Sequence, residues 1–118
     1  MSGIITSEQR ELLFRREDVF KAWLDQISKD LGEDLFEKRE RLSWPVVVEL
    51  IQNHLLSTYR LMSGEIPELL YRIDLNEGEL RAEMQTGNWP DWYQLLANCI
   101  AEREAQKVIF RFQYSGKL

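Results

Sequence analysis

The chain has 118 residues, a net charge of −5 and an isoelectric point near 4.9. Its length suits one domain, and 44% of its residues are hydrophobic, which is enough apolar surface to offset the entropy of ordering a core. The acidic balance argues against a general nucleic-acid-binding protein, because attraction to phosphate supplies most sequence-independent affinity. We therefore expect one globular domain over residues 1–118.

The sequence carries no sign of export or of membrane insertion. Its first residues lack the basic stretch followed by a long apolar run that marks a secretory signal. No apolar run approaches the roughly 20 residues of a membrane-spanning helix. The single cysteine, Cys99, excludes a disulfide within the chain and fits a reducing compartment. These features predict a cytoplasmic protein without a membrane segment.

The first long helix is predicted over residues 7–31. It begins after Thr6, which forms a capping box with Gln9, and it stops at Gly32, which can adopt a left-handed conformation without strain. A short helix, about 34–41, is expected to follow. The apolar residues of the long helix recur at helical spacing and would share one face: Leu13, Phe20, Trp23, Leu24, Ile27 and Leu31.

The second long helix is predicted over residues 44–62. Ser43 can cap its first turn, where Pro45 costs no hydrogen bond because an N–H at this position would have no partner inside the helix. Leu42 and Val47 occupy the two positions of a hydrophobic staple. Its buried face is expected to contain Val47, Leu50, Ile51, His54, Leu55, Thr58 and Met62.

The third long helix is predicted over residues 89–112. Its line of small side chains permits another helix to approach closely. A short helix opens at Pro67, and a further one is expected to follow a capping box of Asp74 and Glu77 and to end near Met84. The predicted fold is therefore all-α: a single-domain helical bundle with three long helices and two or three short connecting helices. The small-residue line is Ala97, Ala101, Ala105 and Val108.

The sequence from Ser43 to Asn53 resembles the sequence from Asn88 to Asn98, and a Trp-Pro pair follows a capping residue in both. One interpretation is a weak helix–turn–helix pseudo-repeat with two equivalent surfaces. The simpler interpretation is that two helices use the same start signal independently, because two units are too few for a solenoid.

The residues best suited to chemistry have simpler structural explanations. His54 is the only histidine and lies in an apolar stripe, which favours a hydrogen-bonded core residue over a base or ligand. Cys99 is expected to be a buried small hydrophobic residue. The acidic segment 74–79 lacks calcium-loop spacing, because Glu79 stands where glycine is needed and Gln85 where a bidentate glutamate is needed. We therefore expect no catalytic residue, no metal and no other cofactor.

Charge is unevenly distributed in the second half of the chain. Residues 65–83 carry six acidic and two basic side chains, a local charge of −4, whereas residues 92–118 carry four basic and two acidic ones, a local charge of +2. The two segments either attract each other within the fold, steer a partner or, more simply, form two solvated faces.

Two groups of side chains could form a recognition surface. Three aromatic residues crowd the first turn of the last helix and cannot easily all point inward, although core packing is the alternative. Three cations recur every four residues further along, although complementing the negative end of their own helix is the alternative. The candidate interaction surface is Trp89, Asp91, Trp92, Tyr93, Arg103, Lys107 and Arg111.

We expect a small interaction or regulatory protein that binds another protein, or a second copy of itself, through this surface. A small-molecule-binding helical bundle is the alternative, and an enzyme is the least favoured class. An enzyme would require His54 or Cys99 to open onto a cleft and touch a second ionisable group. A ligand-binding bundle would require an enclosed cavity lined by aromatic side chains.

Overall fold

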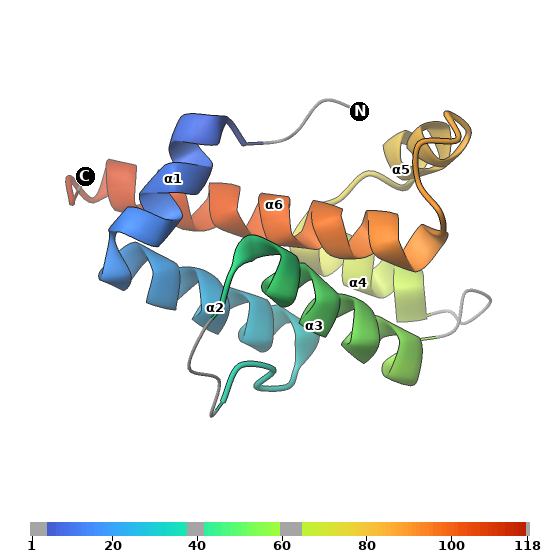
Figure 1. The fold of residues 1–118 in the computed structure, drawn as a ribbon, viewed down its shortest axis with the longest axis horizontal. Helices are drawn as coiled ribbons and strands as arrows, with labels where there is room; N and C mark the ends of the chain where they lie inside the picture. Colours follow the sequence, from blue (N-terminus) through green and yellow to red (C-terminus); the bar gives the residue numbers. More distant parts are fainter. Residues whose placement is uncertain (1–4, 38–41, 60–64, 118) are drawn as a thin grey trace.

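A computed structural model describes residues 5–37, 42–59 and 65–117. Within these ranges the chain forms six α-helices and no strand, which confirms the predicted all-α class (Figure 1). The helices are α1 (Ser7–Arg15), α2 (Glu17–Leu31), α3 (Trp44–Thr58), α4 (Glu65–Ile73), α5 (Glu77–Met84) and α6 (Trp92–Tyr114).

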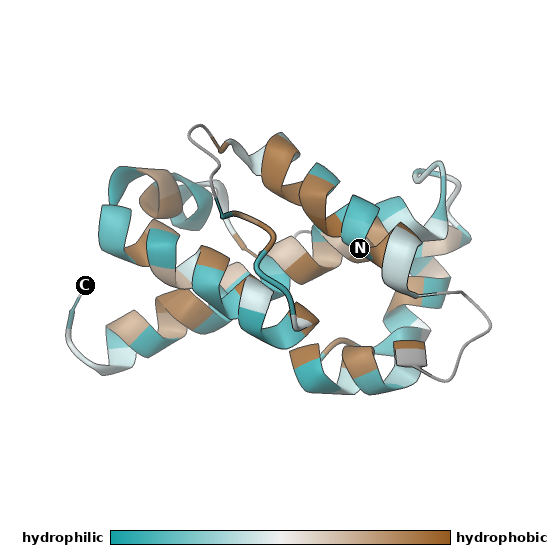
Figure 2. Ribbon diagram, turned by 90° about the horizontal axis from the view of Figure 1, so that it is seen from below, coloured by the Kyte–Doolittle hydropathy of each residue, from teal (hydrophilic) through white to brown (hydrophobic). Residues whose placement is uncertain are grey.

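The longest helix, α6, lies at the centre of the fold, and each of the other five helices contacts it (Figure 1). Its predicted line of small residues is fully buried, as a helix surrounded by neighbours requires. Figure 2 shows hydrophobic and hydrophilic residues alternating along the helices, the pattern of amphipathic helices around a shared core. In the part of the chain that the structure describes, no helix combines the length and apolar character needed to cross a membrane.

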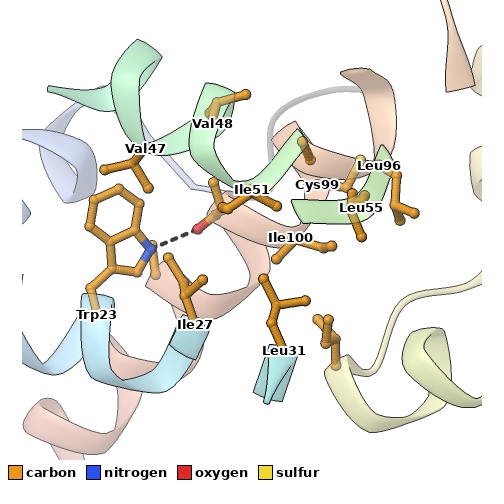
Figure 3. Close-up of a cluster of buried hydrophobic side chains, with 14 of the residues drawn as sticks. Trp23, Ile27, Leu31, Val47, Val48, Ile51, Leu55, Leu96, Cys99 and Ile100 are labelled. Atoms are coloured by element: carbon orange, nitrogen blue, oxygen red, sulfur yellow. Dashed lines mark hydrogen bonds between the residues drawn. The ribbon is translucent and has the colours of Figure 1, made fainter. Parts of the chain in front are cut away.

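Trp23 links four of the helices. Its fully buried indole donates a hydrogen bond from Nε1 to the carbonyl oxygen of Ala101 on α6, at 3.0 Å (Figure 3). Its ring stacks on Trp44 of α3 with centroids 5.1 Å apart, and the ring of Phe14 on α1 meets its edge. The guanidinium group of Arg10, also on α1, lies 4.1 Å from the centre of the Trp44 ring. One aromatic cluster thus ties α1, α2 and α3 to α6.

The single helix predicted over residues 7–31 is wrong, because α1 and α2 are separated at Arg16. This residue has extended backbone angles (φ −108°, ψ 110°), and its guanidinium group binds the Asp18 carboxylate with N–O distances of 3.0 and 2.8 Å. The break allows both helices to pack against α6. The two predicted end signals are confirmed: the capping box is present, and Gly32 ends α2 with φ 77°.

The second predicted helix begins correctly but ends early. Ser43 caps α3 by accepting a hydrogen bond from the N–H of Val46 at 3.4 Å. The helix ends at Thr58 rather than at residue 62, because the backbone of Tyr59 is extended. Thr58 is also exposed rather than buried. Met62 lies outside the described residues.

The short helix predicted over residues 34–41 is not present in its described part, residues 34–37, which form turns. The Asp34 carboxylate accepts hydrogen bonds from the backbone N–H groups of Phe36 and Glu37, both at 3.1 Å. Such local bonding offers the backbone an alternative to a helix. Residues 38–41 lie outside the described part.

The capping box predicted at Asp74 and Glu77 is wrong. Asp74 instead follows the end of α4 in a left-handed conformation (φ 67°), which aspartate tolerates better than most residues. The cap of α5 is Asn76, whose side-chain oxygen accepts a hydrogen bond from the N–H of Glu79 at 3.0 Å. Asp74 and Asn76 are both residue types that cap helices, and the later one begins α5.

The last helix also begins later than predicted. Its cap is Asp91, whose carboxylate accepts a hydrogen bond from the N–H of Gln94 at 2.8 Å. Trp89 therefore precedes α6, whereas Trp44 is the first residue of α3. Because the two Trp-Pro pairs stand differently relative to their helices, the sequence similarity does not correspond to two equivalent helix starts.

Candidate functional site

The aromatic residues predicted to form a recognition surface are half-buried against the core. The indole N–H of Trp89 donates to the Glu83 carboxylate at 3.0 Å, and the hydroxyl of Tyr93 donates to the Tyr59 carbonyl at 2.8 Å. The indole N–H of Trp92 is buried without an acceptor in the described residues. These side chains mainly connect the start of α6 to α5 and to the end of α3.

The three cations of the predicted surface, Arg103, Lys107 and Arg111, form a basic ridge on α6, and two of them bind groups on neighbouring elements. Arg103 places a guanidinium nitrogen 2.7 Å from the Asp74 carboxylate, just after α4. Arg111 donates to the side-chain oxygen of Gln26 on α2 at 3.0 Å. The first of these contacts joins the acidic segment 65–83 to the basic segment that follows it. The ridge therefore holds neighbouring elements against α6.

The third cation, Lys107, belongs to a buried ionic cluster. Its Nζ lies 3.6 Å from the carboxylate of Asp30 on α2 and 3.8 Å from that of Glu104 on α6. Asp30 is buried, and Glu104 is fully buried. Gln26 donates to the Asp30 carboxylate at 3.0 Å, and Arg72 of α4 donates to the Asp30 backbone carbonyl at 2.8 Å. The cluster thus involves α2, α4 and α6.

The two carboxyl groups of this cluster have opposite pKa shifts. Burial raises the pKa of Glu104 to about 9, and the neighbouring Asp30 carboxylate adds to the effect. Burial also opposes ionisation of Asp30, but the neighbouring Glu104 and Gln26 side chains, together with Lys107, outweigh it and lower the pKa of Asp30. The two shifts favour a protonated Glu104 beside an ionised Asp30.

Sequence reasoning missed this cluster, although part of the signal was present. Glu104 stands four residues after Ile100 and four before Val108, so it falls on the buried stripe of the last helix. Its partner Asp30 comes from a distant part of the sequence, and only the packing of α2 against α6 brings the two together.

His54 is buried, as predicted, but it has an acidic partner that the sequence did not reveal. Its Nδ1 lies 3.0 Å from the carboxylate of Glu33, which follows α2. The pair borders a surface hollow of about 400 Å³. The other ring nitrogen, Nε2, is buried and has no hydrogen-bond partner in the described residues. His54 therefore touches an ionisable group but does not offer a free nitrogen to the hollow, as a general base would.

Cys99 is buried, as predicted. Burial raises the pKa of its thiol to about 12, and the negative charge of Glu102 contributes further. The reactive thiolate is therefore scarce at neutral pH. Among the described residues, no three His, Cys, Asp or Glu side chains are grouped in a way that could hold a metal ion.

A groove of about 300 Å³ lies between α3 and α6, and its first lining residue on α6, Gln94, directly follows Tyr93 of the predicted aromatic cluster. Asp91 of the predicted surface shares a face of α6 with Gln94 and Asn98, because the three are spaced by three and four residues. None of the predicted surface residues, Asp91 included, lines this groove. Its lining residues are Trp44, Pro45, Val48, Glu49, Gln52, Gln94 and Asn98.

The groove has an apolar wall and a row of side-chain amides. Trp44, Pro45 and Val48 of α3 form the wall. The side chains of Gln52 and Gln94 make no hydrogen bond to any residue that the structure describes. The groove therefore offers free donors and acceptors beside a hydrophobic surface.

Comparison with known proteins gives no match at any level: no family model fits the chain, no curated protein is recognisably similar in sequence, and no solved structure is recognisably similar in fold. Inference about function therefore rests on the geometry of this chain.

Proposed function

We propose that this protein is an interaction module that binds an extended segment of another protein in the groove between α3 and α6. The observation that carries the proposal is the pair of amide side chains, Gln52 and Gln94, that line the groove without partners in the described residues. A side-chain amide both donates and accepts hydrogen bonds, as does the backbone of an extended peptide.

The apolar wall of the groove supports the same proposal. Trp44 is half-buried and is held between the stacked ring of Trp23 and the guanidinium group of Arg10. A side chain that is already ordered loses little entropy when a partner binds. Together with the neighbouring Pro45 and Val48, Trp44 forms a rigid surface for one apolar side chain of the partner.

The charge around the groove favours a basic partner. Glu49 lines the groove and Asp91 lies on the same helix face as two of its lining residues. The whole chain carries a charge of −5. We therefore propose a peptide with an apolar anchor flanked by lysine or arginine, because complementary charge steers association. The cytoplasmic location expected from the sequence is part of the same proposal.

The small-molecule alternative has less support. The hollow beside His54, which is larger than the α3–α6 groove, is lined mainly by polar and charged side chains, whereas a drug-sized ligand usually requires an apolar, aromatic lining.

Selection from a displayed random-peptide library tests the proposed function. We expect peptides with an apolar residue and nearby cations, bound to the unchanged protein. The Gln52→Ala, Gln94→Ala double variant should bind them about tenfold more weakly, because each lost hydrogen bond is worth roughly 0.5–1.5 kcal/mol. Fluorescence anisotropy measures both affinities.

The matched control is Gln113→Ala, an exposed glutamine near the end of the same helix. It should leave the affinity unchanged. Equal binding by the double variant and the unchanged protein, or a library that yields no binder, would contradict the proposal. A mass that rises with concentration only when both glutamines are intact would show that a second copy of the chain occupies the groove instead.

A further inference from the structure

We propose that Glu104 is a neutral carboxylic acid that donates its proton to Asp30, and that this shared proton keeps α4 docked on α2 and α6. The inference begins with burial. Glu104 is fully buried, and neither of its carboxyl oxygens receives a hydrogen bond from a donor in the described residues. An ionised carboxylate without donors is costly in such a place, whereas a protonated one needs only an acceptor.

Asp30 provides that acceptor. The Nζ of Lys107 lies 3.6 Å from the Asp30 carboxylate and 3.8 Å from that of Glu104, so the two carboxyl groups flank one cation, and two neighbouring carboxylates resist ionising together. Asp30 is the member of the pair that keeps its charge, because Gln26 donates to it at 3.0 Å and Lys107 lies 3.6 Å away. With Glu104 neutral, the charges of Asp30 and Lys107 balance.

The groups that face the pair come from three helices. From α6 these are Lys107 and Arg103, whose positive charges favour ionisation of Glu104 but do not outweigh its burial. From α4 it is Arg72, which donates to the Asp30 carbonyl at 2.8 Å. From α2 it is the neutral Gln26, which is itself bound by Arg111.

α4 is the element most directly tied to this cluster. Arg72 links it to Asp30, and its own carbonyl oxygen accepts a hydrogen bond from Lys107 at 3.4 Å. If Glu104 loses its proton, Asp30 and Glu104 repel each other and both require water or further donors. The nine-residue α4, which these two hydrogen bonds join to the cluster, can move away more readily than α2 or the central α6, so α4 is the helix we expect to open.

Hydrogen exchange measured between pH 6 and 8 tests the proposal. If the opening of α4 releases one proton, its equilibrium constant rises about tenfold per pH unit. The protection factors of α4 amides should therefore fall about a hundredfold over this range. Glu104→Gln keeps a neutral donor in place and should remove that dependence. Glu102→Gln, on the same helix, is the control and should behave as the unchanged protein does.

Three results would overturn the proposal. The first is an equal pH dependence in Glu104→Gln and the unchanged protein. The second is protection of the α4 amides equal to that of the α3 amides at every pH, which would mean that α4 opens only when the whole fold opens. The third result, which needs no variant, is a carboxyl-carbon NMR spectrum of the unchanged protein in which Glu104 is ionised at pH 7. The proposal expects one glutamate signal that stays protonated at that pH.

Discussion

The side chain of Trp23 contacts residues of three other helices, α1, α3 and α6. It is fully buried on α2, donates a hydrogen bond to Ala101 and stacks on Trp44. The helical spacing of apolar residues correctly placed it in the core. The spacing could not indicate the hydrogen bond, because a free backbone carbonyl at the right depth in α6 is a property of packing rather than of either sequence segment.

Replacing Trp23 by phenylalanine should destabilise the fold by about 2–3 kcal/mol. The change removes one buried hydrogen bond and leaves a cavity between α2 and α6. Urea unfolding followed by circular dichroism measures the free energy of unfolding. Trp89→Phe is the control, since that indole is only half-buried. A loss no greater than in the control would contradict the central place assigned to Trp23.

At the scale of the helices, the sequence predicted that a helix begins in a given segment better than it predicted the residue at which that helix begins. Ser43 was identified correctly because no competing cap stands near it. Before α6 two capping residues stand three positions apart, Asn88 and Asp91, and the later one begins the helix. The break at Arg16 carries no glycine or proline, so the continuous apolar pattern hid it. Local sequence decides that a helix begins, and tertiary packing decides between nearby starts.

Substitution of the two candidate caps of α6 tests this assignment. Asp91→Ala should cost about 1 kcal/mol of stability, because it leaves the N–H of Gln94 without its acceptor. Asn88→Ala should change stability by less than about 0.5 kcal/mol, since its side chain caps no helix. Thermal and urea unfolding of both variants give the comparison. A greater loss in Asn88→Ala would mean that α6 begins at the earlier residue.

At the scale of the whole molecule, the sequence predicted the class of fold but not its functional surface. The predicted aromatic and basic residues mostly connect α6 to its neighbours, and none of the predicted set lines the α3–α6 groove. Gln52 and Gln94 were not singled out, because isolated glutamines carry no motif. Their juxtaposition depends on how α3 packs against α6, which pattern and composition do not specify.

The buried acid pair makes a prediction about the stability of the whole chain. The folded pKa of Glu104, about 9, lies above its ordinary 4.5, so the folded state holds one more proton than the unfolded state between these values. The free energy of unfolding should therefore fall by about 1.4 kcal/mol per pH unit as pH rises through this range.

Asp30 acts in the opposite direction at lower pH. Its pKa is lowered in the folded state, so its contribution to stability is present above its ordinary value of 3.8 and is lost as pH falls below it. Together the two groups predict a stability maximum near pH 4–5. Urea unfolding at several pH values locates it. A free energy of unfolding that stays constant from pH 5 to 8 would be incompatible with a protonated Glu104.

The central claim is that a partner peptide binds between α3 and α6, and an NMR titration with a library-selected peptide tests it most directly. The account predicts that the largest chemical-shift changes fall on residues 44–52 and 91–98, including the indole N–H of Trp44. Changes centred on His54 and Glu33, or on α4, with the groove signals unmoved, would contradict it.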